Sequence, residues 1–556
     1  MHSFLSKNHR YLFFGAWLFI NLFQACSTEL FDDEAYYWVY SQFPAWGYFD
    51  HPPMIAIMIK TGYAIFKSEL GVRLLVVLAN TATIFLISKL IDDRNDKLFY
   101  AIALSVAVGH IGGIIAVPDV PLLFFVTLFF FIYRRFLDNM SWPNSLLLGI
   151  SIALMLYTKY HGILLVLFTL LSHPKLFTRY QTYVAGIVSL VLFAPHLHWQ
   201  YVNGFPSVNY HLLERNASAY QIEYTSEYLL SQLALAGPFV GWLFIWSAIR
   251  YKTMSAVEKA LQYTLIGFYI FFLISTFKGR VEANWTLPAF VGLIVLGHQY
   301  LKDKPLVTKW VYRSLPLTLF LVLLMRIYMM VDVESMRKIG KDEFHQNAEW
   351  TGIISQKAGG RPVVFVDSYQ RPSKYWFYQQ SPALGLNTPD YRRNNYDFWP
   401  IEENYIGKSV YVVGDDNNPV LTDKIMAPQL KRKASAFIPR YFSFMKAQFT
   451  DIKTRSSSDK VVSSFHVTVP EEYLTYFQTA PFDTASIQLA IINFTDRIRY
   501  FPSVTKVNEI RECNERLSVT FPVRLPKGTY DARLGISSAV PGEPTLNSPS
   551  FRINIK

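Results

Sequence analysis

The sequence predicts a polytopic α-helical membrane protein with a second, non-membrane region at its C-terminal end. Hydrophobic residues make up 51% of its 556 residues and charged residues only 17%, below the roughly 25% charged that is usual in soluble domains. Apolar runs of membrane length recur from the N-terminal end to about Val331. Beyond that residue, no run in the sequence is long enough to cross a bilayer.

Apolar runs long enough to span a bilayer, about 17–25 residues or slightly fewer, predict about eleven crossings. They lie near residues 11–28, 72–91, 98–117, 121–133, 145–158, 162–172, 183–198, 229–249, 261–276, 286–301 and 315–331. The first run follows Lys7 and Arg10, as the apolar part of a signal peptide follows its cations. However, Phe23 and Gln24 fit poorly to the cleavage box of a lipoprotein signal peptide. We therefore expect an uncleaved first helix.

Charges in the loops predict the orientation of the chain in a plasma membrane. Cations concentrate in alternate loops, as expected for cytoplasmic loops; they are Lys7, Arg10, Lys89, Arg94, Lys97, Arg134, Arg135, Lys175, Arg179, Arg250, Lys252, Lys259, Lys302, Lys304, Lys309 and Arg313. The N-terminus is then cytoplasmic, and an odd number of crossings places everything after Val331 outside. The net charge of +12 accompanies no nucleic-acid recognition motif, so we expect no nucleic-acid partner.

The C-terminal residues change from membrane-length runs to short strands. We expect a membrane domain at 1–331, an outer α/β region at 332–430 and an outer β-sandwich-like region at 431–556. Strands are predicted at 361–367 and 408–414, with a helix at 372–380. Alternating patterns predict further strands at 465–469, 486–494, 517–525, 534–538 and 551–555. The two cysteines, Cys26 and Cys513, lack the spacing of a disulfide framework or zinc knuckle.

The first outer loop carries the densest group of polar residues. Asp32, Asp33 and Glu34 come directly after the first apolar run. An aromatic, helix-compatible stretch at 35–43 follows, and the prolines of Asp50-His51-Pro52-Pro53 stop it, because proline disfavours a helix at the residue before it. Residues 54–66 read as a second helix. We expect both helices to lie flat at the membrane surface.

Acidic residues on the outer side have two readings. An isolated triplet such as Asp32–Glu34 is ordinarily a helix cap. However, Asp50 and Asp119 are expected on the same face, and acids at membrane level are functional candidates. Two or three carboxylates suit a divalent cation shared with a phosphate, at Asp50 or Asp119, but they do not require one.

Outer-side cations accompany these acids. They are Arg73, Lys159 (followed by Tyr160 and His161), Lys278 and Arg280. Each alone could be a snorkelling interfacial residue, but the positive-inside rule makes four of them less expected. An anionic ligand with a lipid tail, such as a polyprenyl phosphate, would explain both their charge and their location.

These motifs together resemble the membrane-embedded GT-C glycosyltransferases. The branch is that of dolichyl-phosphate-mannose protein mannosyltransferases and bacterial lipid A aminoarabinose transferases. The resemblance covers residues 10–330 and rests on 33–38 (DEAYYW), 47–53 (GYFDHPP) and 70–74 (LGVRL). Weaker matches follow in order at 118–121 (PDVP), 158–160 (TKY) and Arg280 with Asn284-Trp285.

The resemblance implies transfer of a sugar from a polyprenyl phosphate to an acceptor hydroxyl, with inversion at the anomeric carbon. The acceptor would be lipid A, a protein or a glycan. Asp33 would be the base, with Glu34 orienting it and Asp119 as a second acid, while Asp50 resembles a cation-binding position. The remaining implied substrate contacts are His51, Arg73, Lys159, Tyr160, Lys278, Arg280, Glu282 and Asn284.

Two other functions stay open at this point. A transporter or flippase of a polar lipid would place charges near the bilayer midplane, often in matched halves. Here the charges are predicted at one face and no repeat is visible. A non-catalytic scaffold with a glycan-binding outer domain would not need Asp33, Asp50 and Asp119 on one face.

Overall fold

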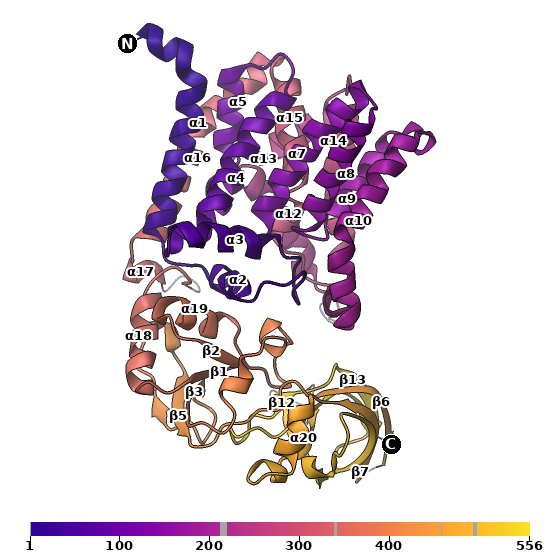
Figure 1. Cartoon of the computed structure of the whole chain (residues 1–556). Coiled ribbons are helices and arrows are strands. Elements are labelled where there is room, and N and C mark those ends of the chain that lie inside the picture. The colour runs from indigo at the N-terminus through magenta and orange to yellow at the C-terminus, as the bar shows by residue number, and fades with distance from the viewer. Residues whose placement is uncertain (1, 212–219, 338–341, 458, 493–497, 556) are drawn as a thin grey trace. The chain divides into compact units, whose positions relative to one another are not determined.

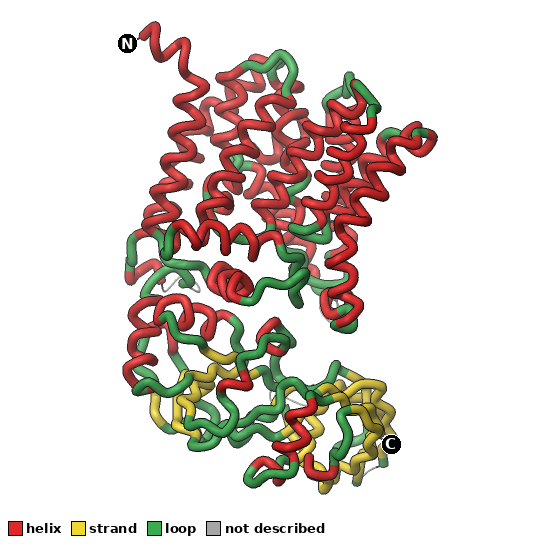
Figure 2. Tube along the Cα trace, in the orientation of Figure 1, coloured by secondary structure: helices red, strands yellow, loops and turns green. Residues whose placement is uncertain are grey.

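The computed structural model describes residues 2–211, 220–337, 342–457, 459–492 and 498–555. The chain forms two compact units, Met1–His345 and Gln346–Lys556 (Figure 1). The first is helical and the second mixes strands with helices (Figure 2). The first unit extends past the expected limit at residue 331, because Phe344 packs into a cluster with Ala25, Val77, Ile114 and Met329.

Within the described residues, five helices are long and apolar enough to cross a membrane: α4 (Glu69–Leu90), α7 (Asp119–Asp138), α10 (Tyr180–Val202), α14 (Ala256–Ser275) and α16 (Pro305–Met330). The number rises to eight if three sharply bent helix pairs each count as one span. These pairs are α1 (His2–Ser27) with α2 (Asp32–Gln42), α5 (Asp96–Ser105) with α6 (Ala107–His110) and η1 (Gly112–Ile114), and α12 (Ile222–Ala236) with α13 (Gly241–Arg250). The chain is a multi-pass membrane protein.

Shorter apolar helices account for the rest of the predicted crossings. They are α8 (Trp142–Leu156), α9 (Gly162–Ser172) and α15 (Ala289–Leu301). Helix α3 (Met54–Ile65) is also short and apolar, but it coincides with a helix predicted at the membrane surface and not with a crossing. Every predicted crossing coincides with a helix or a bent pair. However, the 15 residues of α8 extend only about 22 Å at 1.5 Å per residue, against a hydrocarbon core of about 30 Å. The total of eleven therefore stays a prediction, while the helical membrane architecture is confirmed.

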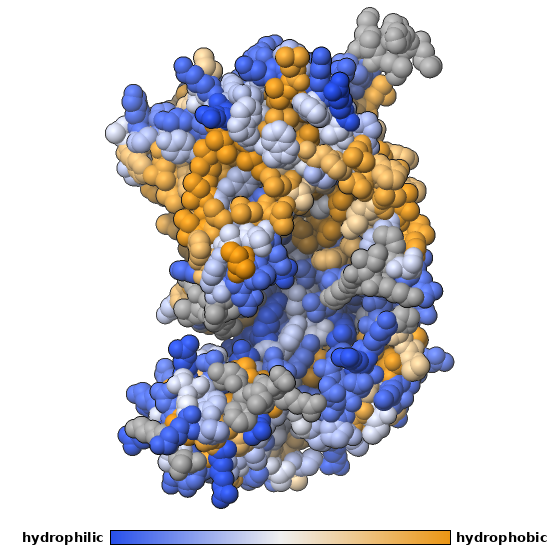
Figure 3. Space-filling model, turned by 180° about the vertical axis from the view of Figure 1, so that it is seen from behind, coloured by the Kyte–Doolittle hydropathy of each residue, from blue (hydrophilic) through white to orange (hydrophobic). Residues whose placement is uncertain are grey.

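The outward faces of the long helices are apolar, as lipid contact requires. Ile187 and Leu190 on α10 are 63% and 61% exposed, and Phe320 on α16 is 54% exposed. Figure 3 shows a hydrophobic band across one face of the helical unit, bounded by hydrophilic residues at the end nearest the N-terminus. A soluble protein rarely exposes a continuous apolar surface of this kind.

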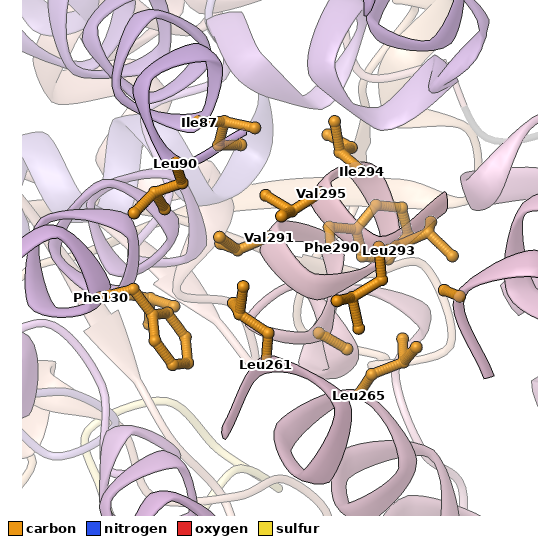
Figure 4. Packing of buried hydrophobic residues seen from close by; sticks show 14 of the residues in the cluster. Ile87, Leu90, Phe130, Leu261, Leu265, Phe290, Val291, Leu293, Ile294 and Val295 are labelled. Atoms are coloured by element: carbon orange, nitrogen blue, oxygen red, sulfur yellow. The ribbon is translucent and has the colours of Figure 1, made fainter. Parts of the chain in front are cut away.

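Helix α15 lies at the centre of the helical unit. Its residues from Ala289 to Gln299 are buried, as expected of a helix that is hydrophobic on all sides. Figure 4 shows Val291 and Val295 facing Ile87 of α4 and Phe130 of α7, with α14 on the other side. This core positions α4 and α7, which carry the candidate site residues Arg73 and Asp119 near their N-terminal ends.

Helices α2 and α3 lie across the ends of the bundle helices, at the end opposite the N-terminus (Figure 1). This confirms the two helices predicted in the first loop, although α2 begins at Asp32 and so includes the acidic triplet. Gly71 lets α3 meet α4 closely, since a Cβ there would lie 1.8 Å from the carbonyl oxygen of Phe66. We refer to this end of the helical unit as the α2–α3 face.

The second unit begins with an α/β layer. Its sheet has the order β2-β1-β3-β5-β4, in which β1 runs parallel to β2 and β3, and β5 runs antiparallel to β3 and β4. The strands are β1 (Val363–Val366), β2 (Ala383–Leu386), β3 (Val410–Asp415), β4 (Asp423–Lys424) and β5 (Lys433–Ile438), with helices α18 (Asn347–Ala358) and α19 (Gln370–Gln379). The predicted strands at 361–367 and 408–414 and the helix at 372–380 are confirmed. The sheet continues to residue 438, past the expected limit at 430.

The rest of the second unit is β-rich. One sheet has the order β10-β7-β6 and the other β12-β11-β8-β9, with β13 paired to β11. Both contribute to one apolar core that includes Phe449, Phe465 and Leu534. The bounds are β6 (Gln448–Ser456), β7 (Lys460–Thr468), β8 (Ser486–Ile491), β9 (Arg499–Lys506), β10 (Asn514–Pro522), β11 (Gly528–Ile536), β12 (Thr545–Leu546) and β13 (Phe551–Ile555). All five predicted strands have counterparts, and residues 493–494 of one prediction lie outside the described residues.

Three further α-helices are short. They are α11 (Pro206–Asn209) and α17 (Glu334–Arg337) in the first unit and α20 (Glu471–Phe477) in the second.

Candidate active site

A fully buried ion pair joins α2 to α4 at the α2–α3 face. Arg73 Nε donates to Glu34 Oε1 at 2.7 Å and its Nη2 donates to Glu34 Oε2 at 2.5 Å. The two residues are 1% and 0% exposed. Such a two-pronged arginine–carboxylate contact is strong and fixes direction as well as distance.

Arg73 also satisfies the end of α1. The last carbonyls of a helix have no partner within the helix. Arg73 Nη1 donates to the carbonyls of Ala25 and Thr28 at 3.2 and 2.6 Å, and Nη2 donates to that of Glu29 at 2.9 Å. Arg73 therefore holds the 85° bend between α1 and α2. The structure places this predicted substrate contact in the interior, where it ties three segments of the protein together.

Glu34 has two further hydrogen bonds. Its Oε2 accepts the backbone N–H of Phe31 at 2.9 Å, as in an ordinary helix cap. Its Oε1 accepts the backbone N–H of Ala116 at 2.7 Å, which lies three residues before Asp119. The capping explanation of the acidic triplet thus holds for Glu34, and the same carboxylate connects the first loop to the turn that carries Asp119.

Asp33 is the most exposed member of the triplet. It is half-buried in the first turn of α2, whereas Asp32 and Glu34 are buried. Because its neighbour Glu34 is anchored on both oxygens, the backbone at Asp33 is held in place. A carboxylate in the first helical turn is also favoured by the helix dipole.

Buried Asp119 and Lys159 and half-buried Asn284 form a second cluster. Lys159 Nζ donates to Asp119 Oδ1 at 2.7 Å and Asn284 Nδ2 donates to Oδ2 at 2.9 Å. The three come from the first residue of α7, the turn between α8 and α9, and η4 (Ala283–Thr286). Asp119 and Lys159 are 3% and 5% exposed. Sequence reasoning named all three residues, and the structure brings them together.

Asp50 lies against the aromatic face of α2. The hydroxyls of Tyr36 and Tyr40 donate to its Oδ2 at 3.2 and 3.3 Å. His211 Nε2 lies 3.2 Å from its backbone oxygen. The neighbouring His51 is half-buried, and its ring lies 5.6 Å from that of Tyr37 in an edge-on arrangement.

A polar chain links Tyr160 to the first loop. The Tyr160 hydroxyl lies 3.0 Å from His196 Nε2 and accepts a hydrogen bond from Gln200 Nε2 at 2.9 Å. His196 Nδ1 in turn lies 2.7 Å from the backbone oxygen of Trp46. Desolvation raises the pKa of Tyr160 above its usual range, so its hydroxyl keeps its proton at neutral pH.

The remaining predicted contacts lie at the surface. Lys278 and Arg280 are exposed and Glu282 is half-buried. Arg280 Nε pairs with Glu227 at 3.4 Å, and both side chains are more than half exposed. These residues precede η4, which supplies Asn284, but the structure shows no contact of Lys278 or Arg280 with Asp119 among the described interactions.

Comparisons with known proteins show what this chain is similar to. Residues 50–199 match the sequence model of the dolichyl-phosphate-mannose-protein mannosyltransferase family. The predicted GT-C resemblance is thereby confirmed. The matched segment contains Asp50, Arg73, Asp119 and Lys159.

Individual relatives are more distant. The chain is 23% identical over 285 residues to the lipid A galacturonosyltransferase RgtD of Rhizobium johnstonii, covering 49% of this chain and 60% of that protein. It is 23% identical over 269 residues to an uncharacterized protein of Aquifex aeolicus, covering 46% of this chain and 54% of that one. The alignments thus span little more than half the length of these relatives.

Solved structures share the fold. The chain superposes on ArnT from Cupriavidus metallidurans bound to undecaprenyl phosphate with a TM-score of 0.57 at 14% identity. For ArnT in the apo state the TM-score is 0.58 at the same identity. Each superposition covers 78% of this chain and 98% of ArnT. The fold is therefore ArnT-like, which confirms the predicted fold class.

Asp50 and Asp119 have few further ligands nearby for a metal ion. Within the described residues, neither Asp50 nor Asp119 belongs to a group of three or more His, Cys, Asp or Glu side chains at ligand distance. Lys159 and Asn284 each take one acceptor position on Asp119, so fewer of its positions are left for a cation. Lys159 already supplies positive charge beside Asp119.

Sequence reasoning missed several residues of this site. Tyr36 and Tyr40 are spaced i, i+4 on α2, and this spacing could have shown that both hydroxyls face one side. His196, Gln200 and His211 gave no such signal, because they are distant in sequence from the loop they contact.

Proposed function

We propose that this protein is an inverting glycosyltransferase that moves a sugar from a polyprenyl-phosphate donor to an acceptor hydroxyl at the outer face of the plasma membrane. The family match over residues 50–199 and the ArnT-like fold support this class. The observation that carries the proposal is the Glu34–Ala116 hydrogen bond, which connects the helical turn that carries Asp33 to the turn before Asp119, the partner of Lys159.

Asp33 is the proposed base. It takes the proton of the acceptor hydroxyl while that oxygen attacks the anomeric carbon. The bond from the anomeric carbon to the phosphate oxygen breaks, and its electron pair leaves with the polyprenyl phosphate. Because attack and departure occur on opposite sides, a single displacement inverts the anomeric centre. Glu34 acts as a positioning residue.

Positive charge stabilises the departing phosphate. Lys159 is buried beside Asp119 and is the proposed contact at the reaction centre. Lys278 and Arg280 are exposed and would meet the phosphate as the lipid enters. Tyr160, His51, Glu282 and Asn284 are proposed to contact the sugar or the acceptor, and Arg73 acts on them only through Glu34.

The polyprenyl donor and the acceptor are proposed on chemical grounds. ArnT has been crystallised with undecaprenyl phosphate, and RgtD is named for lipid A. Lipid A is therefore the first acceptor to test, followed by protein and glycan hydroxyls. The concentration of cations in alternate loops favours an outer α2–α3 face and a cytoplasmic N-terminus, which is the orientation that a lipid-linked donor on the outer leaflet requires.

The test is sugar transfer by the full-length protein in detergent. The protein is incubated with a panel of undecaprenyl-phosphate sugars and with lipid A, peptide or glycan acceptors, and products are identified by mass spectrometry. Asp33→Asn and Asp119→Asn are compared with Asp138→Asn, which changes the last residue of the same helix that Asp119 begins.

We expect transfer by the wild type and Asp138→Asn. Loss of at least a hundredfold is expected for Asp33→Asn, as is usual for removal of a general base. Equal rates for the wild type and Asp33→Asn would remove Asp33 as the base. Product with retained configuration would exclude single displacement.

A further inference from the structure

Three potential metal ligands gather immediately after α16, outside the site described above. They are Asp332, Asp342 and His345, and one ligand atom from each lies within 4.8 Å of the others. We propose that these residues bind one divalent transition-metal ion, Zn²⁺. The proposal is independent of the glycosyltransferase function.

The spacing of the donors suits a shared ion. His345 Nδ1 lies 3.0 Å from both carboxylate oxygens of Asp342. Tetrahedral ligands at the zinc distances of about 2.0–2.2 Å are themselves separated by about 3.4 Å, close to this spacing. The same spacing would serve a hydrogen bond between a histidine and an aspartate without metal, so the distance alone does not choose between the two.

The burial and the charge of the two carboxylates favour a bound metal ion. Asp342 and His345 are 7% and 5% exposed, and a buried carboxylate needs compensating charge. Asp332 brings a second carboxylate to the same point. One Zn²⁺ neutralises both carboxylates, and the imidazole ligates it without adding charge.

Arg337 shares Asp332 with the proposed ion. Its Nε lies 2.9 Å from Asp332 Oδ1. An ionised carboxylate offers about four lone-pair sites on two oxygens, so Asp332 can keep this ion pair and still ligate a metal. The side chain of Asp332 is 34% exposed, which leaves solvent access for a water as fourth ligand, as in many zinc sites.

The surrounding residues hold the ligands in position. Asp342 Oδ1 accepts the backbone N–H of Phe344 at 3.1 Å, and the Phe344 ring lies 5.5 Å from that of Phe31. The Tyr328 ring meets the imidazole of His345 edge-on at 5.3 Å. Ordered ligands of this kind lower the cost of metal binding.

The donor set points to zinc rather than to magnesium or calcium. Hard cations prefer all-oxygen sites, whereas an imidazole with carboxylates suits zinc and related transition metals. Bound zinc would fasten residues 342–345 to the end of α16 and so brace the point at which the helical unit ends.

Metal content of the purified full-length protein tests the proposal. The protein is equilibrated with micromolar ZnCl₂ in detergent, desalted and analysed by inductively coupled plasma mass spectrometry. His345→Ala, Asp342→Asn and Asp332→Asn are compared with His173→Ala, a loop histidine elsewhere in the same unit, and with Asp50→Asn. X-ray absorption at the zinc edge identifies the ligands, and His345→Cys exchanges the ring nitrogen for a sulfur.

We expect about one zinc per chain in the wild type, in His173→Ala and in Asp50→Asn, and at least a tenfold loss in His345→Ala and Asp342→Asn. His345→Cys should retain zinc with one sulfur ligand. Absence of stoichiometric zinc in the wild type, retention in His345→Ala, or loss in Asp50→Asn would each overturn the proposal. The two variants at buried ligands could fail to elute as folded protein. In that case Asp332→Asn, which changes the more exposed ligand, is the deciding variant, and an unchanged zinc content in it would overturn the proposal.

Discussion

Replacing Arg73 with methionine should destabilise the helical unit severely. Methionine keeps most of the apolar stem but removes all donors, which leaves the buried carboxylate of Glu34 uncompensated. Removing one partner of a buried ion pair typically costs about 3–5 kcal/mol. The carbonyls of Ala25, Thr28 and Glu29 also lose donors, at about 1–3 kcal/mol for each that water cannot reach. We therefore expect a loss of at least about 3 kcal/mol, since a buried pair is broken.

A double-mutant cycle separates the ion pair from the carbonyl contacts. Glu34→Gln is measured alone and together with Arg73→Met. In the double variant no charge is left buried, so we expect a coupling energy of about 1–3 kcal/mol between the two sites. The free energy of unfolding is obtained by titrating the detergent-solubilised protein with SDS and following its fluorescence.

A surface ion pair provides the control for this measurement. Arg134 Nη2 lies 2.8 Å from Asp92 Oδ1, and these side chains are 39% and 64% exposed. Arg134→Met should cost no more than about 1 kcal/mol, the usual upper value for exposed pairs. An Arg73→Met variant as stable as Arg134→Met would refute the assignment of Arg73 as the tie between α1 and α2. Additive single effects would refute the direct coupling to Glu34.

Three further outcomes can be checked. Lys159→Met should lower sugar transfer at least a hundredfold, because Asp119 loses its buried cation and the phosphate its proposed contact; initial rates measure this. Gly47→Ala should lower both stability and activity, because its Cβ would lie 2.5 Å from the Trp199 ring; thermal unfolding and initial rates measure this. Desolvation raises the pKa of Asp367 to about 7, above the roughly 3.9 of an unfolded chain. Its stabilising contribution is therefore complete below about pH 4 and disappears as pH rises through about 7, and the unfolding temperature followed by tryptophan fluorescence should fall over that range.

Matched variants control these measurements. Lys175→Met changes a lysine of η2 (Pro174–Thr178) and should leave transfer unchanged. Gly186→Ala adds a Cβ that meets nothing within 4 Å and should not lower stability. Asp367→Asn keeps a side-chain acceptor for the backbone N–H of Thr388 but cannot ionise, so it should flatten the pH dependence. If the unfolding temperature of Asp367→Asn depends on pH as that of the wild type does, groups other than Asp367 cause the dependence.

Much of the membrane fold could be predicted because hydrophobic length is a local property. The same holds for β1 and for the first four residues of β3, which are uninterrupted runs of valine and aromatic residues. By contrast, β2 spans only Ala383–Leu386 and includes a glycine, so its four residues carry no distinguishing pattern. Strand β6 carries charged residues at alternate exposed positions and is recognisable only through its partner β7.

The candidate site divides in the same way. Asp119 and Lys159 could be predicted as neighbours because charge patterning placed both at the same face. The role of Arg73 could not be predicted. In the sequence, a cation at the start of a helix looks the same whether it faces solvent or a carboxylate 39 positions earlier. Only the packing of α1, α2 and α4 shows that Arg73 is interior.

The contacts of Arg73 and Glu34 also define what a protein engineer would have to move. The acidic loop of residues 29–34 is not a transferable cassette, because its shape depends on Arg73 of α4 and on the backbone of Ala116 before α7. If the loop alone were grafted onto another helical scaffold, the Glu34 carboxylate would be buried in an apolar interior without its arginine partner. The smallest transplantable module is the end of α1, all of α2, the start of α4 and the turn before α7, carried together.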